Sequence, residues 1–530
     1  MYERIDTVDL QNLILGIELG STRIKGVLID ENNTVIASGG YGWENDLTDG
    51  VWTYPLEKAV EGVRACYSQL RQEFENKYGR KLTRVGAMGI SGMMHGYLVF
   101  DKDGKQIAPF RTWRNTITGP AAAELSELFS FNIPQRWSIA HLYQAILNGE
   151  AHVPEIAQLT TLSGYIHGLL TGVHAMGINE ASGMFPYDEV TGDFDAARIA
   201  QFDELVASRN FPWKLRDILP AVLPAGAIAG FLTEEGAALL DESGTLEAGI
   251  PLCPPEGDAG TGMVATGAVL PRTGSISAGT SAFSLQVLER PLKNWYPEID
   301  VVATPAGKTV AMAHTNTCTS EIDAWVNLIA DATKVMGCPV DLNELYPALY
   351  RTALEGDADC DGIIAFNYFA GEPLTGTETG RPMLLRLPGS KLSIANLMRS
   401  QLYGAIATLK LGMDMLAREE NVESDRLLGH GGFFKTPGVG QQILADALNV
   451  PISTMETAGE GGPWGMALLA AFMHRKEDGE TLEDYLTNRV FQNAASTTLT
   501  PNPEGVAGFQ TYLTRYQTAL AAQKAAGAMV

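Results

Sequence analysis

The sequence predicts an α/β protein built from two similar domains. The chain has 530 residues, which is more than one hydrophobic core usually organises. Apolar runs typical of strands alternate with segments whose apolar residues recur at helical spacing. A strand, a turn of glycine and hydroxyl residues and a second strand occur at residues 13–30 and again at 274–285. Because these two patterns lie about half the chain apart, they suggest a repeated domain.

Composition and charge exclude some classes of partner. The chain is 45% hydrophobic and 19% charged, as in a globular protein in water, and its formal net charge is −24. Such a field repels nucleic acid and anionic membranes, so we expect neither as a partner. A phosphorylated ligand therefore needs locally arranged backbone donors. The acidic surface does not prevent a homodimer.

The cysteines and the first residues predict a cytoplasmic protein. The five cysteines are scattered, odd in number and without a CxxC pair, which favours reduced thiols. Residues 1–9 carry acids and no apolar core of a signal peptide. No apolar run reaches the roughly 18 residues that a membrane span requires. We therefore expect neither a targeting signal nor a membrane segment.

Residues 13–30 predict a hairpin with an exposed tip, followed by a third strand at 35–37. Backbone N–H groups of the tip, with a nearby lysine, suit a phosphate, although a plain polar loop explains the same pattern. The residues concerned are Gly20, Ser21, Thr22 and Lys25. Glu18 lies inside an apolar strand, where an acid without a partner or metal is costly. We favour a functional role for Glu18.

The next elements predict a ligand loop at the end of a strand. Residues 55–78 have helical spacing, and 85–91 form an apolar strand that leads to Met94 and His95. Loops at the carboxyl ends of strands bind ligands in open α/β sheets. His95 can bond a polyol hydroxyl while Met94 packs on carbon, but a lone histidine is more often a satisfied one.

Two further segments are less specific. Residues 111–115 combine flat and hydrogen-bonding groups, including Trp113 and Asn115, which suit a small polar ligand or an ordinary surface loop. Helix-rich sequence follows to about residue 165. Residues 178–183 are predicted to form another loop beside a ligand.

The segment 255–262 places one carboxylate, Asp258, among several glycines. Gly257, Gly260 and Gly262 permit backbone conformations and close approaches that a Cβ would block. We therefore predict a tight turn that presents Asp258 to a ligand cleft. The alternative is an Asx-turn without a function.

The second half repeats the hairpin and adds a glycine-rich loop. The turn at 279–281 contains Gly279, Thr280 and Ser281, and together with the first hairpin it suits a polyphosphate gripped from both sides. Residues 427–434 predict a strand entering a glycine turn, which includes Gly431 and Gly432 and is common in α/β proteins with or without nucleotides. The other predicted elements are a helix capped by Ser393, a helix at 441–449, a strand at 450–452 and an Ala/Leu-rich helix opening at Glu460.

In their order and spacing these motifs resemble the FGGY carbohydrate kinases of the actin/hexokinase/Hsp70 superfamily, and most of all its xylulokinases. The resemblance covers almost the whole chain. It is carried by the motifs 16–22 with Lys25, 94–96, 113–115, 257–258, 279–281, 371–372 and 431–432 with 442–446. It implies two actin/hexokinase-like (ribonuclease H-like) domains with a cleft between them. It also implies that residues 1–268 bind the sugar and carry the base, and that 269–530 bind mainly the nucleotide.

The resemblance further implies ATP-dependent phosphorylation of a ketopentose, D-xylulose to D-xylulose 5-phosphate. Asp258 accepts the proton of the sugar hydroxyl, and Glu18 with Asp258 holds Mg²⁺. The implied sugar contacts are Met94, His95, Trp113, Asn115 and Asp258. The implied ATP contacts are Gly20, Ser21, Thr22, Lys25, Gly279, Thr280, Ser281, Gly431 and Gly432.

The chain departs from the family pattern in several places. Glu18 and Asn115 stand where the family usually has aspartates or other acids, residues 138–143 replace a signature, and the loop at 434–437 is longer. These departures concern the sugar more than the reaction. The alternatives are a kinase for ribulose, a deoxy-ketose or a polyol, and a non-catalytic module that senses sugar or nucleotide.

Overall fold

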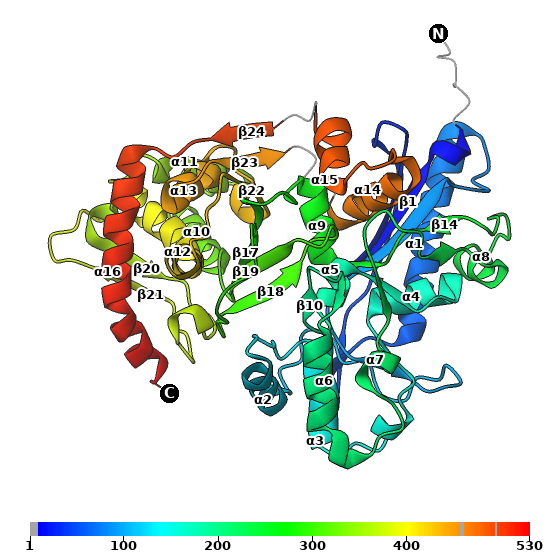
Figure 1. Cartoon of the computed structure of the whole chain (residues 1–530). Helices are drawn as coiled ribbons and strands as arrows, with labels where there is room; N and C mark the ends of the chain where they lie inside the picture. Colours follow the sequence, from blue (N-terminus) through cyan, green and yellow to red (C-terminus); the bar gives the residue numbers. More distant parts are fainter. Residues whose placement is uncertain (1–8, 456–460, 493–495, 530) are drawn as a thin grey trace, which may run out of the picture. The chain divides into compact units, whose positions relative to one another are not determined.

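The computed structural model describes residues 9–455, 461–492 and 496–529. The chain folds into two compact units. The first comprises Met1–Val269, Val301–Val310 and Gly459–Ala494, and the second comprises Leu270–Asp300, Ala311–Ala458 and Ala495–Val530. The first chain crossing therefore falls between residues 269 and 270, and two later segments return to the first unit. Figure 1 labels many of the elements of both units.

The sheet of the first unit is built around the predicted hairpin. Strand β1 (Ile14–Leu19) pairs antiparallel with β2 (Arg23–Ile29) and parallel with β6 (Ala87–Gly92), and β2 pairs with β3 (Val35–Gly42). The strand order is β13-β14-β6-β1-β2-β3, with β15 (Glu256–Gly257) also paired to β6. The predicted strands are confirmed, and the third is longer than expected.

Helices pack against this sheet. Helix α1 (Leu56–Tyr78) confirms the helix predicted at 55–78, packs on β3, and ends at Gly79 in the left-handed conformation. Helix α14 (Gly461–Arg475) packs on β1 and on α9 (Asp258–Thr266). Gly16 allows this contact, because a Cβ there would lie 2.2 Å from the carbonyl oxygen of Pro463. Glu460, where we predicted the start of α14, lies outside the described residues, as do residues 1–8.

The remaining elements of the first unit complete the sheet or lie in its insertions. The helices are α2 (Gly119–Phe129), α3 (Ser138–Leu147), α4 (Leu162–Thr171), α5 (Ile178–Ser182), α6 (Ala196–Leu205), α7 (Leu215–Ile218), α8 (Glu234–Leu240) and α15 (Leu482–Tyr485). The strands are β4 (Asp46–Thr48), β5 (Val51–Thr53), β7 (Leu98–Phe100), β8 (Gln158–Thr160), β9 (Ala175–Gly177), β10 (Tyr187–Asp188), β11 (Asp193–Phe194), β12 (Ala221–Leu223), β13 (Gly230–Phe231) and β14 (Pro251–Leu252). Short single turns of helix occur at Leu10–Asn12, Val153–Glu155, Ala207–Arg209 and Leu486–Val490.

The sheet of the second unit repeats this pattern. Strand β16 (Thr273–Ala278) pairs antiparallel with β17 (Ala282–Val287) and parallel with β22 (Arg426–His430), as β1 does with β2 and β6. The order is β18-β19-β17-β16-β22-β23-β24. The outer strands are β18 (Ile299–Ala303), β19 (Thr309–Thr315), β23 (Ile452–Met455) and β24 (Ser496–Leu499). The predicted second hairpin is confirmed, and each unit has its own core of buried hydrophobic residues.

Helices of the second unit surround its core. Helix α12 (Ile394–Glu420) begins after Ser393, whose Oγ accepts a hydrogen bond from the backbone N–H of Asn396, which confirms the predicted cap. The others are α10 (Ser320–Val335), α11 (Leu342–Ala353), α13 (Val439–Leu448) and α16 (Pro503–Gly527). Strands β20 (Ile363–Phe366) and β21 (Met383–Arg386) pair with each other, and short turns of helix occur at Cys360–Gly362, Pro373–Thr375 and Gly432–Phe434.

Two local predictions were wrong. Residues 178–183, expected as a loop, form the buried helix α5, since Asn179, Glu180 and Ser182 all face the interior. The segment 255–262, expected as a tight turn, is the short strand β15 followed at once by α9. The strand expected at 450–452 instead begins at Ile452.

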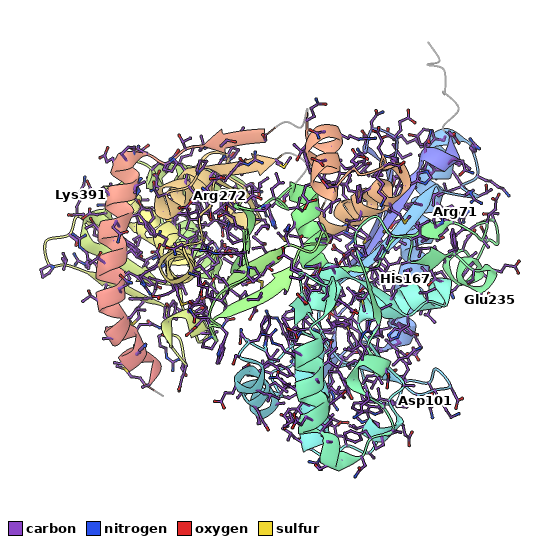
Figure 2. The ribbon with its side chains drawn as sticks, viewed as in Figure 1. Arg71, Asp101, His167, Glu235, Arg272 and Lys391 are labelled. Atoms are coloured by element: carbon purple, nitrogen blue, oxygen red, sulfur yellow. The ribbon has the colours of Figure 1, made fainter. Side chains whose placement is uncertain are left out.

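None of the described helices is both long and apolar enough to span a bilayer. All five cysteines are free thiols, of which only Cys338 is exposed. In the second unit, Arg272 (labelled in Figure 2) precedes β16 and makes two hydrogen bonds to the Asp425 carboxylate just before β22. This fork fixes the start of the two parallel strands.

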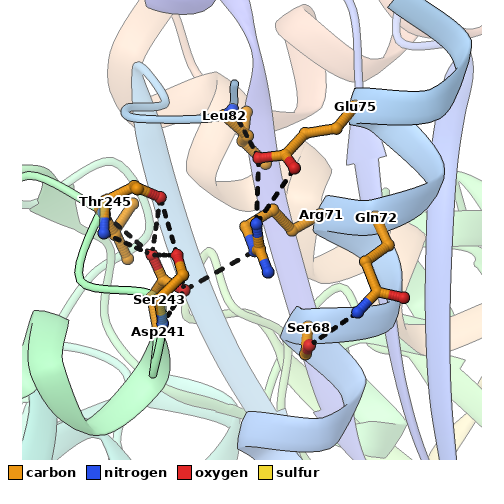
Figure 3. Close-up of polar contacts among 9 residues, drawn as sticks. Ser68, Arg71, Gln72, Glu75, Leu82, Asp241, Ser243 and Thr245 are labelled. Carbon is orange, nitrogen blue, oxygen red and sulfur yellow. Dashed lines mark hydrogen bonds and ion pairs between the residues drawn. The ribbon is translucent and has the colours of Figure 1, made fainter. Parts of the chain in front are cut away.

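A buried carboxylate joins α1 to the loop that follows α8 (Figure 3). Asp241 accepts hydrogen bonds from Ser243, Thr245 and the Leu246 N–H, and its Oδ1 lies 3.6 Å from Arg71 Nε. Burial alone raises the pKa of Asp241, but these hydrogen bonds outweigh it and hold the pKa below its usual value of 3.8.

The lowered pKa predicts a pH-dependent contribution to stability. Asp241→Asn should lower the free energy of unfolding by about 1–3 kcal/mol at pH 7. Because the folded-state pKa lies below the unfolded one, this contribution is present above pH 4 and is lost as the pH falls through the folded value. Urea unfolding at pH 7, 4 and 3 measures the difference from the parent chain. Asp103→Asn, on an exposed loop, is the control, and a difference that does not shrink with acid would contradict the assignment.

Candidate functional site

Asp258 is the first residue of α9 and directly follows β15, which pairs with the end of β6. Its Oδ1 accepts a hydrogen bond of 3.2 Å from the Met94 N–H, in the loop after β6. Asp258 is exposed to solvent. Desolvation by the surrounding protein nevertheless raises its pKa, although hydrogen bonds from the N–H groups of Met94 and Ala259 act to lower it. Asp258 is thus a carboxylate that a ligand can reach.

Glu18 lies near the end of β1, opposite Lys25 on β2 and Ser91 on β6. Desolvation, with the negative charge of Asp258 added, raises the pKa of Glu18 to about 7 against the opposing effect of Lys25. The carboxylate lies against the start of α14, because a Cβ on Gly462 would be 1.3 Å from Glu18 Oε2. The acid predicted to need a partner therefore has both a lysine and a second carboxylate nearby.

The Glu18 and Asp258 carboxylates fit a hard cation. Their mutual repulsion and desolvation both fall when a positive charge is bound. Among the described residues, no cluster of three or more His, Cys, Asp or Glu side chains forms a metal site. One or two carboxylates with phosphate oxygens and water is the usual protein environment of Mg²⁺, and the chemistry of this pair is compatible with that ion.

The loop after β6 holds His95 as a neutral ring. His95 has a φ of 70° and is buried, and its Nδ1 lies 2.9 Å from the Gly183 carbonyl oxygen. Burial, helped by the charge of Arg136, lowers the pKa of His95 to about 3. Since the carbonyl can only accept, we assign the proton to Nδ1, which leaves Nε2 as an acceptor. The ring stacks with Trp137 at a centroid distance of 6.2 Å.

Asn115 is engaged in hydrogen bonds within the protein, whereas the Trp113 side chain is partly exposed. The Asn115 amide accepts from the Trp52 N–H and donates to the carbonyl oxygens of Trp52 and Thr112, all within 2.8–3.0 Å. It therefore anchors β5 and has its donors and acceptor used inside the protein. Trp113 is 39% exposed.

The first hairpin turn, Gly20–Ser21–Thr22, has its carbonyl oxygens turned to the protein. They accept hydrogen bonds from Trp43 Nε1, Tyr54 Oη and the Trp43 N–H, respectively. Within the described part of the chain, the N–H groups of Ser21 and Thr22 donate to no backbone or side-chain acceptor. The turn therefore offers two unused donors, as the phosphate interpretation requires.

The second hairpin turn, Gly279–Thr280–Ser281, is held in the same way. The Gly279 carbonyl accepts from the N–H and Oγ1 of Thr319, and the Thr280 carbonyl accepts from the Cys318 N–H. Thr280 is exposed. Both turns thus have their carbonyl oxygens held by neighbouring segments.

Gly431 brings the glycine-rich loop against this second turn. Its φ is 100°, and a Cβ there would lie 2.5 Å from the Ala278 carbonyl oxygen, one residue before the turn. Gly432 has open space where its Cβ would be. Two motifs predicted to bind nucleotide, far apart in sequence, are therefore adjacent within the second unit.

Several site residues were missed by the sequence analysis. Glu180 and Glu256 are fully buried beside Asp258, and burial raises the pKa of both, that of Glu256 to about 8. Glu180 and Glu256 lie beside Asp258 only through the tertiary structure of the first unit, which no local sequence pattern indicates. Glu372, by contrast, belongs to the motif noted at 371–372; in the second unit it is buried and accepts from the N–H groups of Asn316 and Thr317, just before the residues that hold the second turn.

The first unit thus presents an accessible carboxylate next to a loop with a neutral histidine, and each unit has a glycine/hydroxyl hairpin turn on its sheet. These features are compatible with a class of protein that transfers phosphate to a hydroxyl group. Family comparison agrees with this class. Residues 13–264 match the N-terminal domain, and residues 274–474 the C-terminal domain, of the FGGY family of carbohydrate kinases. The chain belongs to this family and is a carbohydrate kinase. Kinases of the family use ATP as phosphate donor.

The curated relatives and solved structures agree on the fold. The chain is 21% identical over 522 residues to the xylulose kinase of Haemophilus influenzae, covering 96% of this chain and 99% of that protein. The chain is 22% identical to the xylulose kinase of Lactococcus lactis, and the match covers 94% of each protein. The structure of xylulose kinase from Rhodospirillum rubrum has a TM-score of 0.77 at 19% identity, covering 96% of this chain and 98% of that one. The structure of gluconate kinase from Lactobacillus acidophilus has a TM-score of 0.77 at 17% identity, covering 97% of this chain and 99% of that one. The two-domain FGGY kinase fold expected from the sequence is thus confirmed.

Proposed function

We propose that this kinase phosphorylates the terminal hydroxyl of a ketopentose and that its acceptor is D-xylulose, giving D-xylulose 5-phosphate. The observation that carries the proposal is the solvent-accessible Asp258 carboxylate, held by the Met94 N–H next to the neutral His95. The relatives named xylulose kinase, which match nearly the whole chain, support the choice of sugar.

In this proposal Asp258 is the general base. The sugar oxygen attacks the terminal phosphorus of ATP, its bond to the ADP oxygen breaks, and the hydroxyl proton passes to the Asp258 carboxylate. The Met94 N–H orients that carboxylate, and general-base assistance is typically worth about 10²–10⁴-fold in rate. The rest of phosphoryl transfer is positioning and neutralisation of charge.

Residues of the first unit would read the sugar. The unprotonated Nε2 of His95 accepts from a sugar hydroxyl, and Met94 and Trp113 offer apolar contact. Asn115 contributes by holding the 111–115 loop, since its amide is engaged with Trp52 and Thr112. This assigns sugar and base to residues 1–268, and nucleotide mainly to 269–530.

Backbone donors would hold the nucleotide. The N–H groups of the two hairpin turns, with Lys25, bind phosphate oxygens, and the backbone at Gly431 and Gly432 accommodates the adenosine. Mg²⁺, when bound, would neutralise phosphate charge, and Glu18 and Asp258 are the residues that would hold it. The free thiols support a cytoplasmic enzyme, and a homodimer is compatible with it.

A different acceptor is the alternative to xylulose. The gluconate kinase structure shares the fold with this chain, so ribulose, a deoxy-ketose or a polyol belongs in any substrate panel. The accessible Asp258 carboxylate and the family membership favour an enzyme over a non-catalytic sensor. Initial rates of ADP release with D-xylulose and with each compound of the panel identify the acceptor. A clear preference for another compound would overturn the assignment of D-xylulose.

Removal of the base should abolish transfer without removing nucleotide binding. Asp258→Asn keeps the size of the side chain but cannot take a proton, so kcat should fall about 10²–10⁴-fold. ADP release under saturating sugar measures the rate, and calorimetric titration with ADP checks binding. A variant that retains turnover would eliminate Asp258 as the base.

Glu18 should act through the metal. Glu18→Gln should raise the Mg²⁺ concentration for half-maximal rate about tenfold or more while leaving the KM for sugar nearly unchanged, because the variant loses a carboxylate ligand. Glu18→Asp, which keeps the charge, is the matched comparison and should remain closer to the parent chain. An unchanged Mg²⁺ requirement in Glu18→Gln would show that Glu18 has only a structural role.

The adenosine loop permits a paired test. Gly431→Ala should weaken ADP binding about tenfold or more, since the positive φ and the close Ala278 carbonyl leave no room for a methyl group. Gly432→Ala meets nothing within 4 Å and should affect the fold of the loop little. Calorimetric titration of both variants with ADP gives the result, and equal affinities for Gly431→Ala and the parent chain would contradict the assignment.

A further inference from the structure

We propose that Asn179 is a positioning residue, which caps helix α9 from another element and thereby sets the orientation of Asp258. The same side chain links α9 to the hairpin tip formed by residues 301–310. This inference rests on the proposed function in one respect, the role of Asp258 as base.

Helix α9 lacks the usual means of capping its own N-terminus. Its N-cap residue is Gly257, which has no side chain to accept hydrogen bonds from the first turn. A larger residue is excluded there, because a Cβ would lie 2.2 Å from Met94 Cγ and 2.5 Å from Glu180 Oε2. The packing that brings Met94 to Asp258 therefore removes the local cap.

Asn179 supplies the missing acceptor. Its Oδ1 accepts a hydrogen bond of 2.9 Å from the Gly260 N–H. Gly260 is the third residue of α9, where a side-chain N-cap normally makes its bond. Asn179 is fully buried on α5, and a Cβ on Gly260 would lie 2.5 Å from Asn179 Cγ. The amide thus fits tightly over the first turn, which carries Asp258.

The other end of the amide holds the hairpin tip. Asn179 Nδ2 donates to the Ala303 carbonyl at 2.7 Å, and Ser182 Oγ accepts from the Ala303 N–H at 2.9 Å. Ser182 Oγ also donates to the Asn179 carbonyl at 2.6 Å. Since one end of the amide faces a donor and the other an acceptor, its orientation is determined.

The hairpin tip belongs to strands that continue into the other sheet. Residues 301–310 pack in the first unit, while the rest of β18 and β19 belongs to the second unit. In that sheet β19 neighbours β17, which with β16 bears the second hairpin turn. Lys308 Nζ and the Thr309 N–H, which bind Glu189, fix the tip further. Within the first unit, Asn179 therefore joins residues 301–310 to the helix of Asp258.

The test compares two glycines of the same helix. Gly260→Ala places a methyl group against Asn179 and should displace it, whereas Gly262→Ala meets nothing within 4 Å. We expect kcat to fall about 10–100-fold in Asn179→Ala and Gly260→Ala, with the KM values for sugar and ATP changed less than threefold, because misplacing a catalytic group affects mainly the chemical step. Gly262→Ala should keep the parent kcat. Gly260→Ala carries the test if Asn179→Ala does not fold.

A double-mutant cycle separates positioning from general damage. In the Asp258→Asn background, Asn179→Ala should cause little further loss, since the group that it positions is already inactive. An equal loss in both backgrounds, or parent kcat in Gly260→Ala, would overturn the inference. Full activity of Asp258→Asn alone would instead refute the proposed base, so the two failures are distinguishable. Ser182→Ala, which spares the Gly260 bond, should lower kcat less than Asn179→Ala does.

Discussion

The concentration of carboxylates around the start of α9 is the constraint on which the candidate site depends. Asp258, Glu18, Glu180 and Glu256 lie in the first unit, and burial raises the pKa of every one. Their charges also oppose one another, since Asp258 raises the pKa of both Glu18 and Glu180. Isolated carboxylates in such surroundings take up protons or cations. A reaction that brings a metal–phosphate complex and releases a proton fits this environment.

Backbone N–H groups and glycines allow these carboxylates to lie close together inside the protein. Met94 and Glu180 donate their N–H groups to Asp258 and Glu256, which offsets part of the desolvation. Gly257 and Gly462 leave space for Glu180 and Glu18. Neither glycine has a positive φ in the way that Gly431 does. The glycines near the acids thus serve close packing, while Gly431 serves conformation as well.

Regular elements and single candidate residues could be predicted from the sequence, but contacts between residues distant in the chain could not. Both hairpins were predictable because alternation and turn residues are local signals. Asp258 was identified from its glycines, but the same glycines gave the wrong local structure, since they usually mark turns. Residues 178–183 were also mistaken for a loop, although residues 178–182 are helical. The bond from Asn179 to Gly260 spans 81 residues and has no local signature. Likewise, an asparagine in the 111–115 segment is a residue type that often contacts ligands. Only the structure shows that the Asn115 amide is engaged in hydrogen bonds with Trp52 and Thr112.

The two sheets show how one design supports different chemistry. Glu18 stands two residues before the first hairpin turn and faces Lys25 across the antiparallel pair and Ser91 across the parallel one. The corresponding position before the second turn is Ser277, which faces Phe283 and His430. A half-buried acid opposite an exposed lysine is thus replaced by uncharged neighbours, while the burial of His430 lowers its pKa and favours the neutral ring. At this position the first unit has a carboxylate and the second a hydroxyl, while the buried acid Glu372 of the second unit binds the N–H groups of Asn316 and Thr317. The second unit therefore keeps the hairpin geometry of the first but not the carboxylate that precedes its turn.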